Sequence, residues 1–325
     1  TTNGNTVDAN GVVTEAAGSA LSTLDGILIE EESSNLINYS NDLTQSTWAQ
    51  TACTVTDHET VVFAASNTNS GVAQALFSPT TEYTMSVEAR SDDANPLFQF
   101  RFGSGVNLSG DVAITNEWVR YEMTMTTDTG TSLHLTNGSD GLARTVQFRN
   151  IQVEEAAYAT SLIPTAGAAA TRLADDCQTA WPAGLVNDFV VNVEAVVGYS
   201  PTTLVEHLLD SNSSATARTR LFRAGTSVLD YRGNNTSGTE ARVDYNGFAP
   251  ATFHQYKGRK SATQGYTLFV DNALIGTDPI TNPMSEAPTS LVIGASSGNF
   301  RYVDGTLKNL AVYSGDLTDE QVTEL

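Results

Sequence analysis

The sequence predicts an all-β protein with two β-sandwich (jelly-roll) domains in tandem and one short C-terminal helix. Three observations predict this class. Apolar residues recur with a period of two through most of the chain. Turn pairs such as Asn137-Gly138 and Asp140-Gly141 separate the short apolar runs. The chain has 325 residues, which is enough for two hydrophobic cores.

The first half contains six segments with the alternation of a half-buried antiparallel strand. Residues 118–127 are the clearest of these, because large apolar residues alternate there with Arg, Glu and Thr. No helical period is sustained in this half, which favours a sandwich or jelly roll. The expected strands are 72–77, 83–90, 97–102, 118–127, 132–136 and 145–154.

The second half shows the same period and ends in a helix signal. Asp271-Asn272 suits a hairpin turn that requires positive φ. Thr318 and Gln321 have the spacing of a capping box, which predicts the short terminal helix. The expected strands are 189–197, 203–210, 219–224, 227–232, 241–245, 253–259, 265–270, 274–277, 290–294 and 305–313.

A run of small residues divides the two halves. Residues 164–172, PTAGAAATR, show no clear strand or helix pattern, and with residues 173–176 they predict a linker. The expected organisation is an N-terminal extension or connector over 1–25, a first sandwich over 26–163, the linker over 164–176 and a second sandwich over 177–325.

The charge of the chain excludes some partners. The net charge is −21, and residues 1–173 hold 6 arginines, no lysine and 20 acids. Such a chain repels nucleic acid and anionic membranes, because phosphate binding needs clustered basic residues. No apolar run approaches the ~18 residues of a membrane span. We therefore expect neither nucleic-acid binding nor membrane insertion.

Two segments of the first half resemble a known family. Residues 26–48, GILIEEESSNLINYSNDLTQSTW, are similar to the entry of a recurring domain of bacteriophage head and tail fibre proteins. Residues 151–167, IQVEEAAYATSLIPTAG, resemble a second motif of that family. The resemblance covers about residues 5–176. It implies a carbohydrate-binding-module-like sandwich, an extracellular place on the virion surface, other virion proteins as partners and a homo-oligomer, with a trimer favoured.

The end of the chain resembles a different family. The segments LFVDN (268–272), LVIG (291–294) and YVDGTLKNLAVY (302–313) are similar to the closing third of a laminin-G/concanavalin-A-like sandwich. The resemblance implies a lectin-like domain and a host-surface glycan as a ligand.

The sequence shows no recognisable catalytic constellation. None of the four histidines belongs to a Ser or Cys nucleophile motif. Concanavalin-like glucanases carry their carboxylates on one strand as E-x-D-x-x-E, whereas the nearest segment here, Val193-Glu194-Ala195, has one acid. We therefore expect no catalytic residues and no enzymatic activity.

Calcium is the one cofactor that the resemblance suggests. Carbohydrate-binding jelly rolls often hold one structural calcium ion through oxygens of the first and last strands. The matching positions here are Asn38, Asp42 and Asn150, although Arg149-Asn150 stand where such domains usually have two acids.

Candidate sugar-binding residues combine an aromatic face with nearby polar groups at strand ends. Trp48 and Trp118 are expected in the core, and Trp181 at the domain junction. The better candidates lie in the second half: Tyr231, Arg232, Tyr245, Phe300, Arg301 and Tyr302.

Three functions remain open at this point. The first is a structural protein of the virion surface, a head or tail fibre or decoration subunit whose lectin-like domains adhere to host glycan. The second is a pair of ancillary binding modules from a glycan-degrading tailspike or secreted carbohydrate-active enzyme. The third is a purely structural capsid decoration without a ligand. Fold alone does not decide among them, because one fold hosts many functions.

Overall fold

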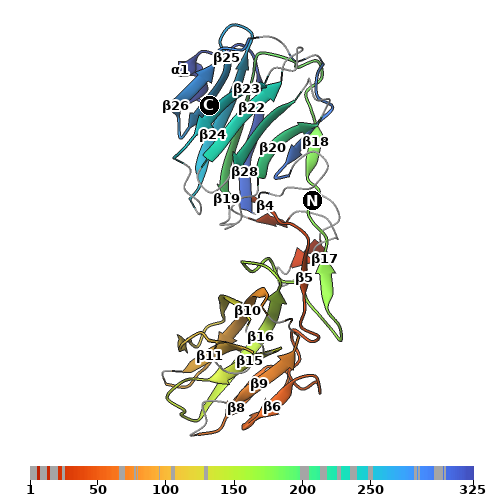
Figure 1. Cartoon of the computed structure of the whole chain (residues 1–325), viewed down its shortest axis with the longest axis vertical. Coiled ribbons are helices and arrows are strands. Elements are labelled where there is room, and N and C mark those ends of the chain that lie inside the picture. The colour runs from red at the N-terminus through yellow and green to blue at the C-terminus, as the bar shows by residue number, and fades with distance from the viewer. Residues whose placement is uncertain are drawn as a thin grey trace. The chain divides into compact units, whose positions relative to one another are not determined.

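The computed structural model of the chain divides into two units (Figure 1). Residues 32–172 form the inserted unit, and residues 1–31 with 173–325 form the flanking unit. The structure describes residues 6–7, 13–14, 21–23, 26–65, 70–76, 78, 80–94, 96–103, 107–127, 131–197, 205–212, 218–224, 228–234, 240–247, 252–281, 284, 286–295, 303 and 305–325.

The inserted unit is a sandwich of two antiparallel sheets. The first has the order β14 (Val119–Thr126), β10 (Glu82–Arg90), β16 (Arg144–Glu154), β8 (Thr60–Phe63), β7 (Cys53–Val55). The second has the order β12 (Asn107–Leu108), β11 (Leu97–Phe102), β15 (Ser132–Asn137), β9 (Gly71–Ala75), β6 (Ala49–Thr51), and β13 (Val112–Ala113) also pairs with β11. The core between them is rich in aromatic residues: Trp48, Phe63, Phe98, Phe100, Phe102 and Phe148.

A separate pair of strands closes this unit. β5 (Ser33–Asn35) pairs with β17 (Ala170–Arg172), so the predicted linker contributes a strand. Asn35 is fully buried beside them. Its amide nitrogen donates to the carbonyls of Ile151 (3.1 Å) and Ile163 (2.8 Å), and its Oδ1 accepts from the amides of Ile37 (3.1 Å) and Val153 (3.0 Å). One side chain thus connects the beginning of the unit to its end.

A buried carboxylate extends this connection. Glu154 is fully buried and accepts hydrogen bonds from Ser33 Oγ (2.5 Å), Gln152 Nε2 (2.7 Å), Thr160 N (2.9 Å) and Thr160 Oγ1 (2.5 Å). Gln152 Oε1 accepts in turn from the Ile163 amide at 2.6 Å. The two sequence motifs that resemble the fibre family therefore meet in one hydrogen-bond network, which we call the clasp.

The flanking unit is a second antiparallel sandwich. One sheet has the order β18 (Gln178–Ala180), β27 (Ser290–Ile293), β20 (Val205–Asn212), β21 (Thr219–Ala224), β22 (Val228–Asn234), β23 (Glu240–Tyr245). The other has the order β26 (Ala273–Asp278), β25 (Gly265–Val270), β24 (His254–Ser261), β19 (Phe189–Val197), β28 (Gly305–Ser314), β4 (Gly26–Ile29), β3 (Leu21–Thr23). A further pair joins β1 (Thr6–Val7) to β2 (Val13–Thr14).

Two tyrosines pack the core of this sandwich against glycines of the opposite sheet. A Cβ at Gly258 of β24 would lie 2.4 Å from the ring of Tyr231 in β22. A Cβ at Gly233 of β22 would lie 2.0 Å from the ring of Tyr266 in β25. The absence of a side chain at these two glycines therefore makes room for the two fully buried rings.

The hairpin and the helix predicted from the sequence are both confirmed. Asp271 and Asn272 have φ of 49° and 66° between β25 and β26. Helix α1 (Asp319–Thr323) has Thr318 as its N-cap, with a complete capping box to Gln321. Buried Lys257 donates to the Val322 carbonyl at 2.9 Å and so holds the helix C-terminus against the sheet.

The structure corrects three expectations about organisation. Residues 26–29 do not open the first sandwich, because β4 pairs with β28 and Ile29 is buried in the flanking core, where Gly294 leaves it room. Trp181 is buried in that same core and stacks edge-on against Phe189. Trp48 is buried as expected, but Trp118 is only half-buried and is not part of the core.

Strand parity explains the position of Trp118. Tyr121, Met123 and Met125 share one parity and pack against the core. Trp118 has the parity of the polar residues, because successive side chains on a strand point to opposite faces.

Candidate functional site

A cluster of paired charges covers the outer face of β20 to β23. Leu221, Tyr231 and Val243 lie opposite one another across three strands and point into the sandwich. Their neighbours therefore point outward. The outward residues form the charge ladder: Asp210, Arg218, Arg220, Asp230, Arg232, Glu240, Arg242 and Asp244.

The arginines of the ladder stand in register. Arg220, Arg232 and Arg242 lie side by side on β21, β22 and β23. Acids separate their charges: Arg220 Nη2 is 2.7 Å from Glu240 Oε1, and Arg232 Nη1 is 3.3 Å from Glu240 Oε2. Burial lowers the pKa of Arg220, and the nearby Arg218 adds to this effect. The ladder thus holds like charges together through shared acids.

Asp230 is the buried centre of the ladder. It is fully buried and pairs with Arg232 at 2.6 Å and Arg242 at 3.3 Å. Burial and a hydrogen bond with Asp244 raise the pKa of Asp230. Burial acts in the same direction on Asp244, but hydrogen bonds with Asp230 and Arg242 outweigh it and lower the pKa of Asp244. Relative to a free carboxyl, the protonated form is therefore favoured at Asp230 and the ionised form at Asp244.

An aromatic stack lies among these charges. The rings of Phe222 and His207 stack with centroids 5.1 Å apart and planes 16° apart. Arg232 and Arg220 lie over the Phe222 ring at 4.8 and 5.6 Å from its centroid. Both rings are buried under this cover, so the accessible part of the face is made of guanidinium and carboxylate groups.

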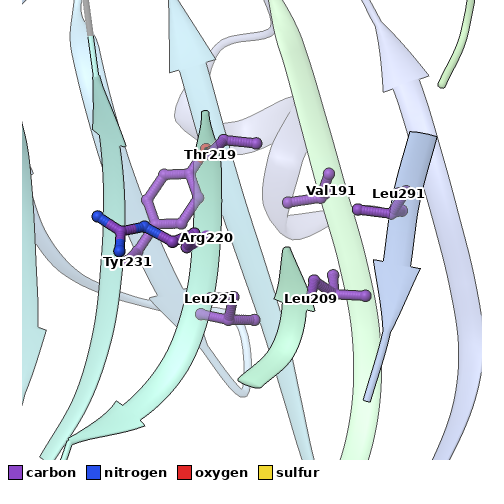
Figure 2. Close-up of a pocket in the computed structure, with 7 residues that line it drawn as sticks. All are labelled: Val191, Leu209, Thr219, Arg220, Leu221, Tyr231 and Leu291. Atoms are coloured by element: carbon purple, nitrogen blue, oxygen red, sulfur yellow. The ribbon is translucent and has the colours of Figure 1, made fainter. Parts of the chain in front are cut away.

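A small gap lies on the inner side of the same strands. Figure 2 shows Val191, Leu209, Leu221, Tyr231 and Leu291 around a small interior gap. The gap has no space large enough for a water molecule. It is a packing feature of the core.

The predicted sugar-binding residues are not brought together. Tyr231 is fully buried, and its hydroxyl accepts from Thr219 Oγ1 at 3.4 Å, so its ring cannot stack on a sugar. Tyr245 is half-buried and packs against the flanking core. Arg232 alone points outward, into the ladder. Phe300, Arg301 and Tyr302 lie outside the described residues.

The predicted calcium ligands serve the local loops instead. Asp42 accepts from Thr44 N (3.0 Å), Thr44 Oγ1 (2.5 Å) and Gln45 Nε2 (2.6 Å), and these bonds lower its pKa. Asn150 has a φ of 51° and donates its backbone N–H to Asn41 Oδ1 at 2.6 Å. The backbone N–H of Asn38 donates to Gln74 Oε1 at 3.2 Å.

This donor set does not fit calcium, which takes six to eight oxygens. It supplies one carboxylate, which already accepts three hydrogen bonds within its own loop. Within the described residues there is also no group of three His, Cys, Asp or Glu side chains that suits a metal ion.

Among the residues that the structure describes, no helix is long and apolar enough to cross a membrane.

Two solved structures show a distant likeness to the chain. The receptor-binding domain of botulinum neurotoxin D shares 8% identity over 45% of this chain and 37% of its own, with a TM-score of 0.36. A CBM40 of the Ruminococcus gnavus IT-sialidase, bound to α2,3-sialyllactose, shares 14% identity over 43% of this chain and 82% of its own, with a TM-score of 0.34. The chain spans about two fifths of the length of the neurotoxin structures that it matches.

The sequence comparisons concern the flanking unit. No curated protein matches the sequence. Residues 190–323 match the model of Laminin_G_3, the concanavalin A-like lectin/glucanases superfamily. This range runs from β19 to α1 and contains the whole charge ladder. The flanking unit therefore contains a laminin-G/concanavalin-A-like lectin domain over residues 190–323.

Proposed function

We propose that this chain is a non-catalytic protein of a bacteriophage virion surface that adheres to host-surface glycan through its lectin-like domain. It is a head or tail fibre or decoration subunit, works outside the cell, contacts other virion proteins and is a homo-oligomer, with a trimer favoured. The observation that carries the glycan-binding role is the match of residues 190–323 to the concanavalin A-like lectin/glucanases superfamily. The acidic chain and its two fibre-like motifs support the virion role.

The charge ladder is the surface that we assign to glycan binding. Its guanidinium and carboxylate groups are planar hydrogen-bonding groups held in register on rigid strands. Arg242, Glu240 and Asp244 are its most accessible members, with 47%, 38% and 37% of their side chains exposed. Sugar hydroxyls donate and accept hydrogen bonds, so they match a face that offers both kinds of partner.

The test is binding of the whole chain to intact cells of candidate bacterial hosts, before and after periodate oxidation of surface sugars. We expect binding that periodate abolishes and that Arg242→Gln weakens. Lys308→Gln is the matched control, because Lys308 is a half-buried cation on the other sheet of the same unit. Folded protein that binds no host, or that binds equally after periodate, would refute the glycan role.

One observation favours a carbohydrate-cleaving function as the alternative. Asp230 and Asp244 are adjacent carboxyls with opposite pKa shifts, as an acid and a base require. However, they hydrogen-bond to each other, whereas glycosidase carboxyls stand about 5–9.5 Å apart with the substrate between them. Release of new reducing ends from host polysaccharide, lost in Asp244→Asn, would establish this alternative.

A further inference from the structure

A tryptophan lies on the outer face of the five-stranded sheet of the inserted unit. Trp118 immediately precedes β14 and is half-buried. Two rows of side chains cross β14, β10 and β16 beside it. In one row Glu88 lies opposite Arg120 on one side and Arg149 on the other. In the next row Arg90 lies opposite Gln147.

Two arginines of these rows stack on the tryptophan. The Cζ atoms of Arg149 and Arg90 lie 4.1 and 5.0 Å from the centroid of the Trp118 ring. Each guanidinium is also fixed at its Nε: Arg149 donates to Glu88 Oε2 at 2.6 Å, and Arg90 donates to Gln147 Oε1 at 2.7 Å. Cation–π contact and hydrogen bond together hold both groups in place before any ligand arrives.

The terminal nitrogens of both arginines remain available. Among the described residues, no side chain or carbonyl accepts from the Nη atoms of Arg90 or Arg149. Arg120 differs, since its Nη2 donates to Ser86 Oγ at 2.8 Å and to the Thr160 carbonyl at 2.7 Å. The face therefore presents two fixed guanidinium groups with open N–H edges next to an aromatic ring.

The charge of this face is opposite to that of its unit. Residues 32–172 contain 15 acidic residues and six arginines, with no lysine. Three of the six arginines lie in these two rows, namely Arg90, Arg120 and Arg149, whereas Glu88 and Glu122 are the acids beside them. A cationic patch in an anionic unit selects for an anionic ligand, because the rest of the surface repels it.

We propose that Trp118, Arg90 and Arg149 form a binding site for a carboxylate-bearing sugar residue, such as a uronic acid unit of a polysaccharide. The planar guanidinium edge matches a carboxylate bidentately. The exposed part of the indole supplies an apolar surface for the C–H groups of the ring. This site and the charge ladder lie in different units, so each can be lost without the other.

The test measures binding of the full chain to polygalacturonate and alginate, with carboxyl-reduced polygalacturonate and dextran sulfate as comparisons. The chain has a net charge of −21 and repels polyanions in general. Binding to an acidic polymer therefore reports a local site. The variants are Arg149→Gln and Arg90→Gln, and the matched control is Arg101→Gln, which removes the same charge from the opposite sheet of the same unit.

We expect one or both uronate polymers to bind, and the carboxyl-reduced polymer and dextran sulfate to bind at least 10-fold more weakly. Arg149→Gln and Arg90→Gln should each weaken binding about 10- to 100-fold through lost charged hydrogen bonds, and Arg101→Gln should not. Periodate-sensitive cell binding through the ladder is a separate readout. The proposal is overturned if folded wild-type protein binds neither uronate, if the reduced or sulfated polymer binds equally, or if all three variants behave alike.

Discussion

The clasp allows a sharp prediction about the inserted unit. Asn35→Ala removes all four hydrogen bonds that the Asn35 side chain makes to buried backbone groups. At a net ~1 kcal/mol for each bond, the loss is about 4 kcal/mol of unfolding free energy. Few single substitutions cost as much, because most destabilise by about 0.5–3 kcal/mol.

A second variant separates hydrogen bonding from volume. Asn35→Asp keeps the shape and the acceptor oxygen but removes the two donations to Ile151 and Ile163. It also places a carboxylate in a fully buried position. We therefore expect Asn35→Asp to destabilise the unit at neutral pH at least as strongly as Asn35→Ala. A purely steric role would leave Asn35→Asp close to the wild type.

The assay must follow each unit by itself, because a chain with two units need not unfold in one step. Urea titration read by hydrogen-exchange mass spectrometry gives the inserted unit its own midpoint. With an m value of about 2 kcal/mol/M, Asn35→Ala should lower that midpoint by about 2 M. Asn41→Ala is the control, since Asn41 is exposed, accepts one bond from Asn150 N and donates only a long bond of 3.5 Å to Ser40 Oγ. Equal shifts for Asn35→Ala and Asn41→Ala would refute the clasp.

Two further predictions use the same assay. Gly258→Ala puts a Cβ 2.4 Å from the Tyr231 ring and should lower the unfolding free energy of the flanking unit by about 1–3 kcal/mol. Gly276→Ala is the control and should change little, because its Cβ would have no neighbour nearer than 3.3 Å. Equal urea midpoints for the two variants would contradict this packing. Burial and the charge of Arg101 lower the pKa of His134 from 6.5 to about 4. Between pH 6.5 and about 4 the unfolded chain binds a proton at His134 that the folded chain does not. The free energy of unfolding is therefore unaffected by His134 above pH 6.5 and decreases as the pH falls through that window. His134→Gln should match the wild type near pH 7.5 and gain stability relative to it toward pH 4.5. The same difference in urea midpoint at both pH values would contradict the shift.

The period-two alternation of apolar residues predicted most of the strands. Long strands such as β10, β16 and β19 alternate clearly and were predicted nearly to their ends. The short strands β6 and β7 were missed, because three residues with mostly exposed side chains show no period. The assignment of β4 to the first sandwich was wrong for a different reason. An apolar strand of four residues fits either core, and only the pairing with β28 decides.

The candidate site was predicted less well, and parity explains why. Tyr231 and Arg232 are neighbours on β22, so they cannot face the same surface. In the structure Tyr231 lies with Leu229 on the core side, and Arg232 lies with Asp230 on the outer side. The same rule explains why Trp118, which was expected in the core, lies on the face of the polar residues. The registers that align arginines across three strands depend on how each strand pairs with the next, which the periodicity within one strand does not determine.

The residues that carry the family resemblance and the residues that we propose to contact a ligand are different sets in this chain. Asn35, Gln152 and Glu154 belong to the most specific sequence motifs, and all three are consumed by the clasp. Their side chains are buried and saturated, so they determine folding and leave nothing for a ligand. Ligand chemistry must then come from outward positions that the fold does not constrain.

Those outward positions differ between the two units. The ladder contains four arginines and four acids that pair with one another, so it presents a polar surface without net charge. On the Trp118 face, each stacked arginine donates a hydrogen bond from its Nε to a neighbouring side chain, and no described group accepts from its terminal nitrogens. A neutral ladder suits hydroxyl groups, whereas open guanidinium edges suit a carboxylate. Two sandwiches of one architecture would therefore recognise different groups of a polysaccharide, because the outer face of a sheet is free to vary while its inner face is fixed by packing.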